Sequence, residues 1–81
     1  MTYGLVFEKI LEPGFEGYYY AHIPSLGLTT HGLGIDGARA MAHDMVTLWI
    51  EELLSEGKPF PSDGEVLLST LEIREDALQT A

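Results

Sequence analysis

Three histidines, His22, His31 and His43, are the residues of this 81-residue chain best suited to acid–base chemistry or metal binding. A neutral imidazole is a common metal ligand, and its charge changes near neutral pH. His22 and His31 fall in successive segments with strand character, so their side chains can converge if those strands are neighbours. Neither belongs to a spacing typical of a metal centre. The sequence therefore favours hydrogen-bonded or solvated histidines over a metal site.

Nucleophiles and carboxylates give no stronger indication of catalysis. The serines lack the GxSxG context of a nucleophile elbow, and the chain has no cysteine. A two-metal nuclease needs several converging carboxylates, for which the residues to test are Glu8, Asp36, Asp44 and Asp63. Ordinary solvated acids explain these residues without any site. We expect no catalytic, cofactor-binding or metal-ligating residues and no enzyme activity, with a metal-dependent nuclease-fold enzyme as the less favoured alternative.

The charge balance indicates which partners the chain can bind. It carries 13 Asp and Glu residues against 4 Lys and Arg residues, a formal net charge of −9. Binding to a nucleic-acid backbone depends on the number of phosphates that Lys and Arg contact, so we expect no direct nucleic-acid binding by this chain alone. A basic partner protein fits better. No apolar run approaches the ~20 residues of a membrane span, and no signal peptide is recognisable, so we expect a cytoplasmic protein.

Three segments in the first half have the pattern of strands. Apolar side chains on both parities predict a strand over residues 3–11, and the Pro13-Gly14 pair predicts the turn that follows it. Aromatic residues crowd residues 18–23, which predicts a second strand and a hairpin. A short threonine-rich segment, residues 28–31, predicts a third strand at an edge.

The second half predicts one helix and a final strand. Residues 35–55 carry the only long helical pattern, which Gly57 and two following prolines end. Residues 65–73 again suit a strand, which can join the sheet beside the first strand in parallel, by a crossover. The sequence therefore predicts an α+β fold of order β-β-β-α-β, one sheet with one long helix packed on it. Residues 1–74 form the predicted domain and residues 75–81 a C-terminal tail.

The predicted helix is apolar over more than half of its circumference. The residues expected to face the sheet have three- and four-residue spacing: Ala38, Met41, Ala42, Met45, Leu48, Trp49 and Leu53. Val46, Ile50 and Leu54 widen the apolar arc beyond what one small sheet can cover. A surplus of apolar surface on so small a domain predicts a homo-oligomer, a dimer or a tetramer.

Candidate interface residues come from this arc and from three consecutive tyrosines. We expect Tyr18 and Tyr20, which share one face of their strand, to pack inside the domain. Tyr19 then lies on the opposite face, where a tyrosine suits an interface anchor. The candidates for binding a partner or another subunit are Tyr19, Val46, Trp49, Ile50 and Leu54.

One stretch of the chain resembles a known family. Around residues 20–32 the sequence carries an aromatic-x-Ala-x-x-Pro-x-Leu pattern, a glycine, a short threonine-containing strand and a second glycine. Ala38 matches an early helix alanine, and residues 57–61 match a Gly-x-Pro-x-Pro ending. In this order, over residues 3–61, the chain is similar to the HicB-like antitoxin family.

The resemblance implies a partial RNase-H-like fold without the nuclease carboxylates, assembled as dimers or larger oligomers. It implies an antitoxin-type protein-binding domain that neutralises a small basic RNase toxin, HicA-like, by covering it. HicB antitoxins commonly carry an added DNA-binding domain, and nothing after Ile73 is long or basic enough to be one. The alternative function is that of a stand-alone self-assembling domain with no toxin.

Overall fold

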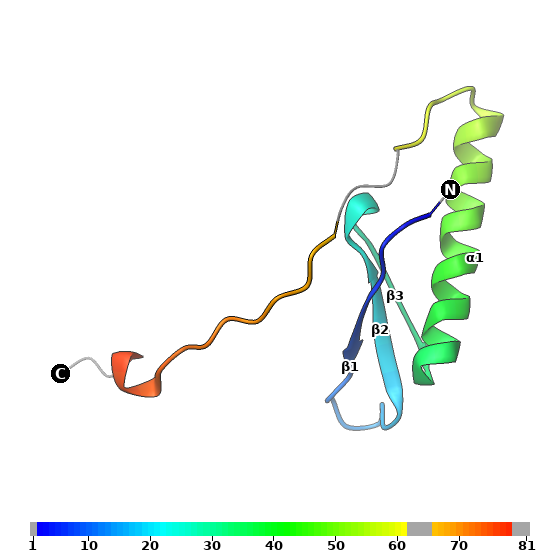
Figure 1. Cartoon of the computed structure of the whole chain (residues 1–81). Helices are drawn as coiled ribbons and strands as arrows, with labels where there is room; N and C mark the ends of the chain where they lie inside the picture. The colour runs from blue at the N-terminus through cyan, green and yellow to red at the C-terminus, as the bar shows by residue number, and fades with distance from the viewer. Residues whose placement is uncertain (1, 62–65, 79–81) are drawn as a thin grey trace.

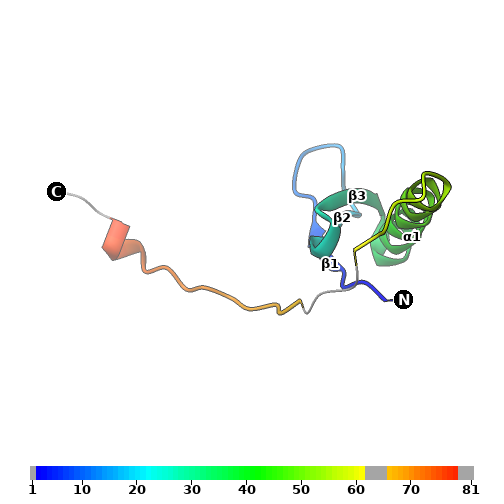
Figure 2. The ribbon, with the colours of Figure 1, turned by 90° about the horizontal axis from the view of Figure 1, so that it is seen from above.

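A computed structural model of the chain describes residues 2–61 and 66–78, and it shows a two-layer α+β body (Figures 1 and 2). The strands are β1 (Val6–Lys9), β2 (Tyr18–Ile23) and β3 (Leu28–Leu33), and the long helix is α1 (Gly34–Ser55). Two short 3-10 turns, η1 (Pro24–Leu26) and η2 (Glu75–Leu78), complete the elements. The predicted α+β class and β-β-β-α order are confirmed.

The three strands form an antiparallel sheet of order β1-β2-β3. Phe7 of β1 lies opposite Ala21, and Tyr20 of β2 lies opposite His31. β3 is two residues longer than predicted, because Leu33 still pairs with Tyr18 at the start of β2. β1 is shorter than the predicted strand, residues 3–11, since β2 offers partners only to its central part.

The core lies between β2 and the first half of α1. Ala21 and Ile23 of the sheet and Ala38 and Ala42 of the helix are fully or almost fully buried and form one cluster. A Cβ atom on Gly32 would lie 2.5 Å from the backbone carbonyl atoms of Gly37. The helix backbone therefore rests directly on β3, and small residues are required where the two cross.

The fourth strand predicted over residues 65–73 is not formed among residues 66–73, and residue 65 lies outside the described residues. The segment extends away from the body instead (Figures 1 and 2). The radius of gyration is 16.7 Å, against about 12 Å for a compact chain of this length. The apolar residues of this segment favour extended backbone, but a strand forms only where it finds a partner edge, and this segment does not pair with its own β1.

No helix among the described residues is long and apolar enough to cross a membrane.

Candidate protein-binding surfaces

The face of α1 that packs on the sheet differs from the predicted face. Ala38, Ala42 and Ile50 are buried and Val46 packs against the core, whereas Leu48, predicted to be buried, is 66% exposed. The contact between Gly32 and the helix backbone explains the rotation, because only the alanine side of the helix can approach β3 so closely. Larger side chains are turned outward as a result.

The rotation changes the status of the five predicted interface residues. Tyr19 and Val46 pack against the core cluster, and Ile50 is only 8% exposed. Trp49 is half-buried, and Leu54 is exposed. The prediction that Tyr18 and Tyr20 pack inside while Tyr19 faces outward is wrong, because the strand parity that buries Ala21 and Ile23 also turns Tyr19 toward α1.

The outward side of α1 carries an apolar strip beside β3. We call this surface the helix strip, and it consists of Met41, Met45, Leu48 and Trp49. Together with Thr30 and two acids, the helix strip lines an open hollow of about 440 Å³. The acids are Asp44 and Glu52. This surface combines exposed apolar side chains with negative charge at its border.

The face of the sheet opposite α1 is covered by no other element among the described residues. We call it the open face, and the strand pairing assigns to it Val6, Glu8, Tyr18, Tyr20, His22, Thr29, His31 and Leu33. The Phe15 ring joins it from the turn between β1 and β2, with centroid distances of 5.9 Å to Tyr18 and 6.3 Å to His31. The open face is therefore rich in aromatic side chains.

A hydrogen-bonded relay crosses all three strands on the open face. The Nε2 atom of His22 lies 2.9 Å from a carboxylate oxygen of Glu8, and its Nδ1 atom lies 2.9 Å from the Thr29 hydroxyl. The Tyr20 ring packs beside the imidazole of His22, with 5.8 Å between the two ring centroids. His31 lies on the same face but contacts Phe15 and Tyr18, so the two histidines have different neighbours.

The relay has the order of acid, imidazole and hydroxyl that activates a nucleophile in hydrolases. Its setting is unsuited to that chemistry, because Glu8 is 64% and His22 is 31% exposed, and water weakens the electrostatic stabilisation on which catalysis depends. Both hollows beside α1 are lined by other residues. This relay has no signature in the sequence. The strand register, once known, reveals it, since it places His22 directly opposite Thr29.

The carboxylates considered for a nuclease are not brought together in the part of the chain that the structure describes. Glu8 contacts His22, and a carboxylate oxygen of Asp44 lies 3.8 Å from Nδ1 of His43. Asp36 is in the first turn of α1. Asp63 lies outside the described residues. Across residues 2–61 and 66–78, no group of three or more His, Asp or Glu side chains can hold a metal ion.

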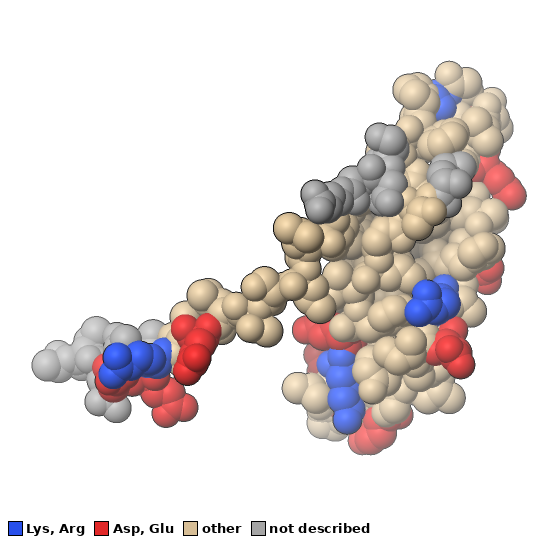
Figure 3. Space-filling view, viewed as in Figure 1, with Lys and Arg blue, Asp and Glu red and all other residues tan. Residues whose placement is uncertain are grey.

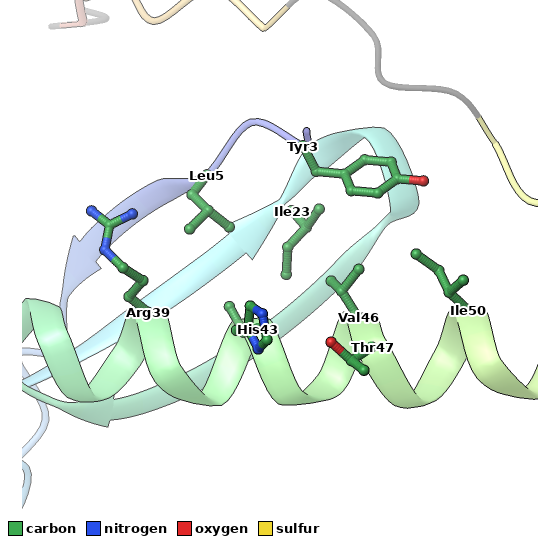
Figure 4. Close-up of a pocket in the computed structure, with 9 residues that line it drawn as sticks. Tyr3, Leu5, Ile23, Arg39, His43, Val46, Thr47 and Ile50 are labelled. Atoms are coloured by element: carbon green, nitrogen blue, oxygen red, sulfur yellow. The ribbon is translucent and has the colours of Figure 1, made fainter. Parts of the chain in front are cut away.

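A groove of about 370 Å³ lies between α1 on one side and, on the other, Ile23 of β2 and the residues just before β1 (Figure 4). We call it the β1 groove. Leu5, which precedes β1, and Ile23 of β2 point toward α1, while Val46 and Ile50 point back from the helix. Its other lining residues are Tyr3, Arg39, Ala42, His43 and Thr47. The groove thus has an apolar floor and a polar rim.

Negative charge is spread over the body and the C-terminal segment, and the basic residues are few (Figure 3). Two of them form ion pairs with acids two residues away. The Lys58 Nζ atom lies 2.8 Å from a carboxylate oxygen of Glu56, and a guanidinium nitrogen of Arg74 lies 2.7 Å from a carboxylate oxygen of Asp76. In the turn before β2, the backbone N–H groups of Glu16 itself and of Gly14 lower the pKa of the Glu16 carboxyl. This acid therefore stays ionised to lower pH than usual.

Comparisons with protein-family models, with curated proteins and with solved structures find no match to this chain. The surfaces themselves therefore carry the functional interpretation.

Proposed function

We propose that the chain is a HicB-like, antitoxin-type protein-binding domain that neutralises a small basic RNase toxin in the cytoplasm by covering it. The observation that supports this most is the open face, an uncovered sheet surface with aromatic side chains and nearby acids. Phe15 lies between Glu12 and Glu16 in the sequence, and Glu8 is on the face itself. Tyrosine is a frequent source of binding energy in protein interfaces.

Each kind of side chain on this surface has a separate part in binding. The acids attract a basic protein and speed its association, as complementary charges do. The rings of Tyr18 and Tyr20 and of the neighbouring histidines then provide the apolar contact area that slows dissociation. The Glu8–His22–Thr29 relay fixes the side chains of three strands relative to one another, so less side-chain entropy is lost when a partner binds.

The test uses the small basic protein encoded next to this chain, if its gene has such a neighbour, as the probe. We expect an equimolar amount of the chain to stop RNA cleavage by that protein. Tyr20→Ala should weaken the complex by about 30-fold, the effect of losing an interface hot spot of ~2 kcal/mol. Leu48→Ala, which removes an exposed apolar side chain from the helix strip, is the matched control and should bind normally. Unchanged RNA cleavage, or a gene without a basic neighbour, would contradict the proposal.

The second candidate is a self-assembling domain that has no toxin. Exposed apolar residues on α1, Leu48 and Leu54 among them, favour it because they enlarge the surface available to another copy. Light scattering separates the two candidates, since only an antitoxin forms a mixed complex with the basic protein.

A further inference from the structure

The C-terminal segment and the β1 groove meet at the N-terminal end of the body. The hydroxyl of Tyr3, a residue of the groove's rim, donates a hydrogen bond to the Pro61 carbonyl at 2.7 Å. A Cβ atom on Gly4 would lie 3.0 Å from a methyl carbon of Val66. The chain thus returns to the side of the sheet on which β1 is the edge, and residues 66–73 begin there.

Residues 66–73 have the composition of a strand without a partner. Leu67, Leu68 and Leu71 are 82%, 82% and 85% exposed. The segment contains neither proline nor glycine, and it is extended and points away from the body (Figure 1). Such an exposed, apolar, extended segment readily pairs with a free sheet edge.

β1 offers such an edge, with an apolar cavity beside it. It is the terminal strand of the sheet, so the hydrogen-bonding groups on its outer side have no strand partner among the described residues. A strand added there would direct every second side chain over the floor of the β1 groove, toward Leu5, Val46 and Ile50. Eight residues of strand span about 26 Å, enough to follow β1 and the residues before it.

We propose that residues 66–73 of one copy add as a strand to the β1 edge of a second copy and fill its β1 groove, and that the second copy returns the same contact. The occupant is a second copy because the segment turns outward from its own groove and lengthens the molecule to 58 Å, against 28 Å and 19 Å in the other directions. A reciprocal exchange is a closed two-fold arrangement that satisfies both segments and both edges. It leaves the open face free, so it is independent of the proposed function.

The first test is the mass of the full chain in solution by light scattering at several concentrations. We expect a dimer, twice the 8.9 kDa of one chain. Leu67→Asp combined with Leu68→Asp should give monomers, because neighbouring residues of a strand face opposite sides and one of the two must enter the groove. The matched control, Leu48→Asp on the helix strip, should remain a dimer, and circular dichroism should show that all variants fold.

The second test identifies which copy supplies the strand. The chain has no cysteine, so cysteines introduced as Thr47→Cys on the groove's rim and Ser69→Cys in the segment are the only thiols. When the two single variants are mixed, one carrying a mass tag, a short bismaleimide should join them as a mixed pair. The proposal would be overturned by a monomeric wild-type chain, by a dimer that survives the double aspartate variant, or by a dimer that dissociates with Leu48→Asp. A variant that carries both cysteines on one chain is the last comparison. If the bismaleimide joins the two cysteines only within that one chain, and never between two copies, the proposal is also overturned.

Discussion

At the scale of single residues, Gly32 determines how closely α1 approaches the sheet. Its Cα faces the backbone of Gly37 and Ala38, with no space for a side chain between strand and helix. The alanines at positions 38 and 42 extend this close contact along the helix. One glycine thus sets both the distance of α1 from β3 and the side that it turns toward the sheet.

We expect Gly32→Ala to lower the free energy of unfolding by about 3 kcal/mol, because the new Cβ would lie 2.5–2.6 Å from three backbone atoms that cannot move independently. Urea unfolding measures the change. Gly37→Ala is the matched control: the nearest atom to its Cβ is 3.6 Å away, an ordinary contact, and alanine is favoured over glycine inside a helix by roughly 0.5–1 kcal/mol. The two variants should therefore shift stability in opposite directions, and equal losses would contradict the close approach.

At the scale of elements, the sequence predicted the strands and the helix because each depends on local features. The aromatic run of β2, and Gly57 and the prolines that follow α1, are all visible without the fold. The rotation of α1 could not be predicted, because its apolar arc is wide enough to be buried on several sides and the choice depends on contact with Gly32. The faces on which the tyrosines lie and the His22 relay could not be predicted either, because both depend on strand register and on the side of the sheet that the helix covers.

The rotation of α1 predicts unequal costs for two alanine substitutions. Ile50→Ala should lower the free energy of unfolding by roughly 2–3 kcal/mol, because Ile50 is buried on the side of α1 that faces the sheet. Leu48→Ala should change it by less than about 0.5 kcal/mol, because most of that side chain is exposed. Denaturant unfolding of both variants measures the difference. The helix orientation predicted from the sequence gives the reverse order, so a larger loss for Leu48 would contradict the structure.

At the scale of the whole molecule, the chain consists of a small packed body and an apolar strand that lies away from it. The body leaves the β1 edge and groove uncovered, and the segment leaves its leucines exposed. Apolar side chains on both faces of the segment predicted the strand, but the partner copy does not follow from the sequence, since the same edge exists on every copy. Both associations proposed for the molecule, with a basic protein and with itself, also involve its net charge of −9.

The two associations should respond to salt in opposite directions. Two copies that each carry −9 repel one another, so raising the ionic strength from about 0.01 M to about 0.1 M, which shortens the Debye length from ~30 Å to ~10 Å, should tighten the dimer. The same change should weaken and slow binding to a basic protein, because it screens an attraction. Sedimentation measures the dimer and stopped-flow mixing measures the association rate. Chloride and sulfate at equal ionic strength should agree, since screening depends on ionic strength and not on the identity of the anion. A dimer that loosens with salt would mean that attractive charge pairs, and not the apolar strand in its groove, hold the copies together.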